Sequence, residues 1–183
     1  MPSLSSLFGH SHPAQPPCLI FQGPDSHGSS RVINLAHQEL AQFTSTKNAI
    51  YRSGKQICAY KHSSMSGTTK LRFQNIEIKM KQTWESMQDG KDIETPTGKL
   101  QWRAGSGGFE ELRKGSVLIA RGKLPGTFRR KHSDLELYVP GDEFLLDLAI
   151  SSWISMLKTK TGNDATAEVV GEVVGALAGA MLS

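Results

Sequence analysis

Basic and apolar residues alternate along two neighbouring segments near the middle of the chain. Lys70 and Arg72 flank Leu71, and Lys79 and Lys81 repeat the alternation a few residues later. In an extended strand, side chains two positions apart lie on one face, about 7 Å from each other. Ammonium and guanidinium groups form strong, charge-assisted hydrogen bonds with phosphate oxygens. The chemistry that this pattern indicates is therefore the binding of an anion.

Further basic residues follow at Arg121 and Lys123, and the charge of the chain is unevenly distributed. Residues 49–140 carry a net charge of +8, whereas residues 141–183 carry −4. A positive field favours anionic partners such as lipid headgroups or phosphates. The alternative is that these are ordinary solvated residues on the outer faces of strands. The candidate ligand-binding residues are Lys70, Arg72, Lys79, Lys81, Arg121 and Lys123.

The sequence offers no constellation for catalysis, so we expect a protein that is not an enzyme and that needs no cofactor. It has no Gly-x-Ser-x-Gly motif, and no Gly-Lys-Ser/Thr follows the glycine-rich segment at 105–108. His10 and His12 lack cysteine or carboxylate neighbours, so we predict no metal site. Cys18 and Cys58 both lie in apolar runs and are interpreted as reduced, buried thiols.

The two ends of the chain differ in composition from the middle. Residues 1–16 are rich in Ser, His and Pro and are interpreted as a disordered leader, without the basic start and apolar stretch of a secretory signal. We therefore expect an intracellular protein, either cytoplasmic or peripheral to a membrane. Glycines recur every four residues within 161–183, which suits a helix that lies on the domain, associates with another copy or dips into a membrane.

Between these ends, residues 17–160 are predicted to form one domain of many short strands. Apolar residues alternate in several segments, for example at Leu71 and Phe73 and at Ile76 and Ile78, with a bulge or strand break required at 74–75. Residues 36–48 could be a helical turn or a polar connection, and the apolar run 117–120 suits a strand buried on both faces. Turns are expected at Ser53-Gly54, Ser66-Gly67, Asp89-Gly90, Thr97-Gly98, Lys114-Gly115 and Pro125-Gly126.

The periodicity changes at residues 142–158, which are predicted to form a helix. Ten of the fourteen residues from Phe144 to Leu157 are apolar, and Asp147, Ser151 and Ser155 form a narrow polar stripe. A helix that is apolar around most of its circumference must be buried. Inside a chain of strands, the place that buries it is a closed sheet. We therefore predict a mainly β fold, an antiparallel closed β-barrel around a central hydrophobic C-terminal helix.

The order of these elements resembles the tubby C-terminal-like superfamily, which includes tubby proteins, phospholipid scramblases and LURP-one-related proteins. The resemblance is carried by residues 99–102, 116–121 and 135–137, followed by the apolar helix, and it is closest to short fungal members. Residues 148–153 look like the tubby helix signature, and Lys70-Leu71-Arg72 looks like the Lys-x-Arg pair with which tubby holds phosphoinositides. The resemblance implies a barrel threaded by a helix, and a headgroup site at Lys70 and Arg72.

Together these observations predict a non-catalytic domain that binds an anionic membrane lipid through basic strand faces. A second hypothesis is a structural or protein-interaction domain whose glycine-rich tail is the contact surface. A third is a carrier of an apolar ligand inside the barrel, although the helix would fill much of that space. Nucleic-acid binding is disfavoured because it needs exposed aromatic platforms, whereas the three tryptophans lie in apolar strand or helix contexts.

Overall fold

The computed structural model describes residues 16–24, 29–83, 90–124, 134–139 and 142–162. The predicted tail therefore lies outside these residues except for its first two positions, and the leader except for its last. A helix, α1 (Glu143–Gly162), follows the strands of the sheet. In chain order these strands are β1 (Leu19–Gln22), β2 (Ser29–Asn34), β3 (Glu39–Ser45), β4 (Ala49–Arg52), β5 (Lys55–Ser63), β6 (Thr68–Phe73), β7 (Ile76–Thr83), β8 (Gly90–Thr95), β9 (Gly98–Ala104), β10 (Glu110–Lys114), β11 (Val117–Gly122) and β12 (Leu135–Leu137).

The twelve strands form one closed antiparallel barrel, which confirms the predicted fold class. Each strand pairs with its neighbours in the sequence, and the sheet closes where Leu19 of β1 lies opposite Leu137 of β12. Closure leaves no described strand at the edge of an open sheet, where it would be available for pairing with another chain. The alternation of apolar and polar residues puts one set inside this barrel and the other outside.

At residues 74–75 the apolar positions change from odd-numbered to even-numbered residues, and this change has a simple structural cause. It is a two-residue hairpin turn that places Phe73 opposite Ile76 and Leu71 opposite Ile78. Gln74 has a φ of 37°, the left-handed conformation that tight hairpin turns require. Because the turn contains two residues, the inward positions change from odd to even numbers. The predicted strand break is therefore the turn between β6 and β7, and the two strands of this hairpin share a continuous apolar inner face.

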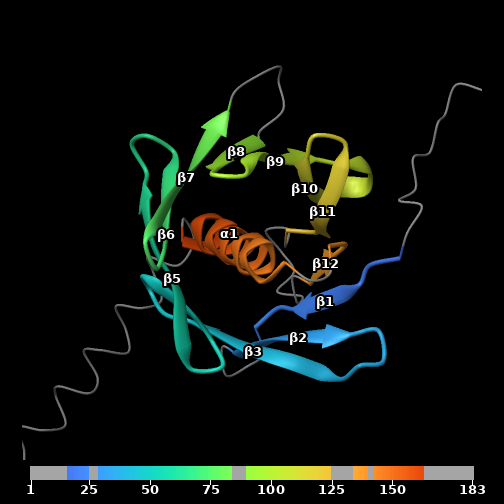
Figure 1. Ribbon diagram of the computed structural model, residues 1–183. Helices are drawn as coiled ribbons and strands as arrows, with labels where there is room; N and C mark the ends of the chain where they lie inside the picture. The colour runs from blue at the N-terminus through green and yellow to red at the C-terminus, as the bar shows by residue number, and fades with distance from the viewer. Residues whose placement is uncertain (1–15, 25–28, 84–89, 125–133, 140–141, 163–183) are drawn as a thin grey trace, which may run out of the picture.

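Helix α1 runs through the middle of the barrel (Figure 1). Leu148, Ile150 and Trp153 are fully buried, as are most of the inward side chains of the strands. The indole N–H of Trp102 on β9 donates a hydrogen bond to Ser152 Oγ at 3.1 Å, and the rings of Trp102 and Trp153 lie 5.5 Å apart. The helix therefore supplies the core that the strands enclose, as predicted for this segment.

The limits of the helix differ from the predicted 142–158. Asp142 is its N-cap, since the backbone N–H of Leu145 donates to Asp142 Oδ1 at 2.9 Å, and the helix continues to Gly162. A carboxylate at this position satisfies N–H groups that have no partner within the helix. The prediction therefore included the cap as a helical residue and ended the helix four residues early.

Two other sequence interpretations are wrong. Residues 39–45, within the undecided segment 36–48, form β3, with the inward Phe43 fully buried between exposed polar neighbours. The run 117–120 is not buried on both faces, because Val117 is exposed. A bulge between β10 and β11 leaves an extra residue, Ile119, that turns inward beside Ala120. Ile119 and Ala120 are therefore both buried in the core although they are consecutive, and burial of the second face of the strand is not needed to explain the apolar run.

Candidate functional site

Three lysines lie opposite one another on the outer face of β5, β6 and β7. The strand register pairs Lys61 with Lys70, and Lys70 with Lys79, and all three are exposed. Directly opposed residues have Cβ atoms about 4.5–5.5 Å apart, and like charges in these positions destabilise a sheet. We call Lys61, Lys70 and Lys79 the lysine ladder. The row ends on β8, where the exposed Glu94 lies opposite Lys79, so an anion lying across β5 and β6 would relieve the repulsion that remains between Lys61 and Lys70.

A single carboxylate on the same hairpin partly compensates this charge. Glu77 lies 3.2 Å from the guanidinium of Arg72 and 3.5 Å from Nζ of Lys70. The hydrogen bond from Arg72, and then the charge of Lys70, lower the pKa of Glu77. Two cations on β6 therefore share one acid, and their side chains remain 53% and 68% exposed for Lys70 and Arg72. Lys81 is likewise exposed and lies on the same outer face as the lysine ladder.

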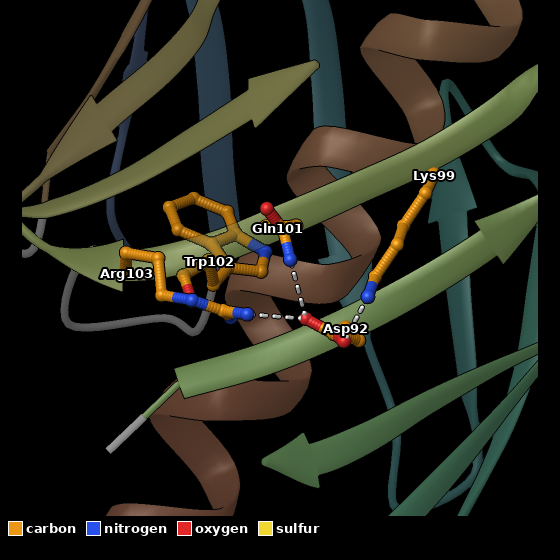
Figure 2. Close-up of polar contacts among 5 residues, drawn as sticks. All are labelled: Asp92, Lys99, Gln101, Trp102 and Arg103. Atoms are coloured by element: carbon orange, nitrogen blue, oxygen red, sulfur yellow. Dashed lines mark hydrogen bonds and ion pairs between the residues drawn. The ribbon is translucent and has the colours of Figure 1, made fainter. Parts of the chain in front are cut away.

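In the adjacent hairpin, β8–β9, two cations again converge on one acid, but this acid is buried. Asp92 lies 2.5 Å from Lys99 Nζ, 2.6 Å from a terminal nitrogen of Arg103, and 3.1 Å from the amide nitrogen of Gln101 (Figure 2). Burial acts to raise the pKa of Asp92, but hydrogen bonds from Lys99, Arg103 and Gln101 hold it below its ordinary value. Lys99 and Arg103 are therefore paired with a buried acid, and Asp92 lies opposite Lys81 at the border of the surface that carries the lysine ladder.

Arg121 and Lys123 lie elsewhere on the barrel. Four strand spacings separate β7 from β11, which is about 19 Å around the sheet. The guanidinium carbon of Arg121 lies 3.9 Å from the centroid of the Phe109 ring, and Lys123 Nζ lies 5.8 Å from it. Arg121 is also 3.9 Å from Glu111. The structure therefore divides the six candidate residues into a group of four on β6–β7 and a separate pair beside Phe109.

A pocket of about 550 Å³ opens at the end of the barrel where α1 begins. Its lining includes Asp147, the acid of the narrow polar stripe on the helix, which is buried. Asp147 faces Arg52 of β4, with 3.2 Å between Oδ1 and the guanidinium. Burial raises the pKa of Asp147 to about 6, although Arg52 acts to lower it. The helix fills the barrel interior, but this open end is not filled.

Other groups that could do chemistry are inert or dispersed in the described part of the chain. Both cysteines are free, but Cys18 is only partly buried, contrary to the sequence interpretation. Cys58 is buried, and burial raises the pKa of its thiol to about 12, so it stays protonated and a poor nucleophile. Among the described residues, no three His, Cys, Asp or Glu side chains gather as a metal site would require.

Sequence reasoning missed two residues of these sites, Lys61 and Arg52. The alternation of Cys58 and Tyr60 inward already placed Lys61 outward, but its position opposite Lys70 depends on the length of the connection between β5 and β6. Arg52 comes from a strand about ninety residues before Asp147, and only barrel closure brings the two together. Local patterns therefore located the strand face and the acid but not their partners.

Comparison with known proteins gives no match to a family model, to a curated protein or to a solved structure. Within the described ranges, no helix has both the length and the apolar character needed to cross a membrane.

Proposed function

We propose that this protein is a non-catalytic binding domain that attaches to anionic membrane lipid through the outer face of β5–β7. The observation that carries the proposal is the lysine ladder, since the register sets Lys70 between Lys61 and Lys79. Placing like charges directly opposite costs stability. A phosphorylated headgroup lying across the ladder converts this repulsion into charge-assisted hydrogen bonds. Arg72 and Lys81 extend the same surface along the strands.

The family resemblance supports the same proposal. We propose that the chain belongs to the tubby C-terminal-like superfamily, since its closed antiparallel barrel around a C-terminal helix agrees with the barrel threaded by a helix that the resemblance implies. Lys70-Leu71-Arg72 would then be the counterpart of the Lys-x-Arg pair that holds phosphoinositides. In this arrangement the protein is peripheral to the membrane, and the positive field of residues 49–140 adds long-range attraction to the anionic leaflet.

The experiment is co-sedimentation with two vesicle preparations, one of neutral phosphatidylcholine and one containing a phosphoinositide. We expect binding only to the anionic vesicles, and we expect it to weaken with added salt. The Lys70→Gln/Lys79→Gln variant should lose most of this binding. Lys47→Gln/Lys114→Gln is the matched control, because it removes the same charge from exposed positions outside the ladder. Equal loss in both double variants would show that only net charge matters and would reject the ladder as the site.

A further inference from the structure

The pocket at the open end of the barrel has the size of a small-molecule site. Its volume of about 550 Å³ lies between β4, β5, the β6–β7 turn and the first turns of α1. Pockets that bind small ligands commonly measure about 300–1,000 Å³ and combine apolar walls with a few polar groups. This pocket meets both conditions, and it lies apart from the outer surface that carries the lysine ladder.

The polar group of the pocket is Asp147, which is only 8% exposed. Its Oδ1 atom is buried without a hydrogen-bond donor among the described residues, although the guanidinium of Arg52 lies 3.2 Å away. A buried acceptor left without a donor costs free energy. Hydrogen-bond donation to the carboxylate from a ligand in the pocket would add to the ion pair with Arg52, so Asp147 is an anchoring point for a donor group.

The charges around Asp147 favour a cationic ligand over an anionic one. Arg52 is shared between two carboxylates, at 3.2 Å from Asp147 and 3.4 Å from Glu143. Two acids therefore face one guanidinium. On β5, Lys55 lies in the lining with an exposed side chain, and Cys58 is neutral because burial raises its pKa to about 12. The charged residues of the lining are thus two bases and two acids, and the buried one of them is Asp147, whose carboxylate would repel an anion and attract an ammonium group.

The walls of the pocket suit an ammonium group attached to an apolar chain. The rings of Phe73 and Phe144 pack edge to face with 5.5 Å between their centroids, and both line the pocket. Aromatic faces attract cations as well as apolar groups, so such rings beside a carboxylate are typical of ammonium recognition. Ile57 and Ile76 add aliphatic surface, and Ile76 is 38% exposed at the β6–β7 turn.

We propose that this pocket binds an alkylammonium ligand, an apolar chain that ends in a protonated amine. The amine donates to Asp147, and the chain lies against Phe73, Phe144 and Ile76. This site uses none of the residues of the lysine ladder and binds the opposite charge. Either proposal can therefore fail without the other.

The affinity should depend on pH in a defined direction. Burial raises the pKa of Asp147 to about 6, so much of this carboxyl group is protonated in mildly acidic solution. An alkylammonium ion keeps its charge over the same range, since its pKa resembles that of lysine, about 10.4. Only the ionised carboxylate attracts the ammonium, so the association constant should rise about tenfold from about pH 5 to about pH 7.

The test is calorimetric titration of the full chain with n-octylammonium and, separately, with octanoate. The side-chain amides of Gln56, Gln74 and Asn75 line the pocket and provide nitrogen resonances that report the place of binding. We expect n-octylammonium to bind, to shift these resonances and to bind more tightly as the pH rises. Binding of octanoate with equal or greater affinity, or no binding of n-octylammonium, would overturn the proposal.

Three variants complete the test. Asp147→Asn should weaken n-octylammonium binding by about tenfold or more and abolish its pH dependence, because the charge is removed while the shape is kept. Ile76→Ser, at the exposed mouth, should weaken binding through the chain and leave the pH dependence intact. Glu94→Gln, an exposed acid outside the pocket, is the matched control and should bind as the wild type does. An unaltered affinity in Asp147→Asn, with its fold verified by the melting temperature, would exclude Asp147 as the anchor.

Discussion

Asp92 and Asp147 are buried to the same degree but have opposite surroundings. Asp92 is 9% exposed and Asp147 is 8% exposed. Three neighbouring side chains donate to Asp92, two of them cations, and its pKa lies below the ordinary value. Asp147 has one guanidinium at 3.2 Å and a pKa raised to about 6.

The difference shows that burial alone does not decide what a buried acid does. At Asp92, donors on β9 compensate the cost of desolvation, so the carboxylate cross-links β8 and β9. At Asp147 the compensation is incomplete, because Arg52 is shared with Glu143. A fully paired acid stabilises the fold, whereas an incompletely paired acid beside a pocket has hydrogen-bonding capacity left for a ligand.

The largest loss of stability should come from substitution of Trp153, the residue that connects the surroundings of Asp92 with those of Asp147. Trp153 lies on the same helix as Asp147, and its ring packs against Trp102, whose carbonyl oxygen accepts a hydrogen bond from Arg103. Trp153→Ala should lower the free energy of unfolding by about 3–5 kcal/mol, as truncation of a buried aromatic residue does. Chemical denaturation measures this loss. Val117→Ala, at an exposed apolar position, is the control and should change stability by less than about 0.5 kcal/mol.

Removing the fully paired acid should have the next largest effect. Asp92→Ala deletes three hydrogen bonds and leaves the partly buried Arg103 without its carboxylate. We expect a loss of about 1–3 kcal/mol in the free energy of unfolding. Glu94→Ala, two residues along the same strand at an exposed site, should have little effect. Equal stability of the two variants would mean that the Asp92 contacts contribute nothing to the fold.

The two acids should also give opposite pH dependences of stability. The lowered pKa of Asp92 adds stability above the unfolded value, and this stability is lost as the pH falls through the folded value. The raised pKa of Asp147 means that stability decreases as the pH rises from about 4 through about 6.

Asp147→Asn should therefore be more stable than the wild type by about 1 kcal/mol near pH 8, with the difference shrinking towards pH 4. Denaturation midpoints measured across this range give the comparison. A difference between the two proteins that is independent of pH would contradict the assignment of the titrating group to Asp147.

The smallest change in stability is expected on the lysine ladder. Lys79→Gln removes a charge that lies between Lys70 on β6 and Glu94 on β8, at a position exposed to solvent. We expect a change within about ±0.5 kcal/mol, since surface substitutions rarely exceed this. The same variant should bind phosphoinositide vesicles more weakly, which co-sedimentation measures. A large loss of stability would mean that Lys79 supports the sheet rather than a ligand.

Local patterns in the sequence were sufficient to predict the strands, the buried helix and the outward direction of Lys70 and Arg72. They were insufficient where the outcome depends on pairing between distant segments. Residues 36–48 look polar because only Phe43 is a bulky inward residue there, and its burial requires β2 and β4 as neighbours. The bulge at Ile119 depends in the same way on the register with β10.

The residues that pair with Asp92 and Asp147 show the same limit of prediction from local sequence patterns. Lys99, Gln101 and Arg103 lie across a short hairpin from Asp92, so strand alternation alone would have found them. Arg52 reaches Asp147 only after the barrel has closed around the helix. A hairpin register can be deduced from the sequence, but a contact between a strand and an enclosed helix depends on the rotation of that helix within the barrel.

The closure of the barrel between β1 and β12 has a consequence for how the protein is made. Phe21 of β1 and Leu135 of β12 are register partners separated by 114 residues. At about 5–20 residues per second, a ribosome needs roughly 6–23 s to synthesise the chain between them. The helix that fills the interior is synthesised later still. A nascent chain therefore exposes the apolar inner face of its strands for many seconds, and general chaperones that shield such surfaces should associate with it until α1 has emerged.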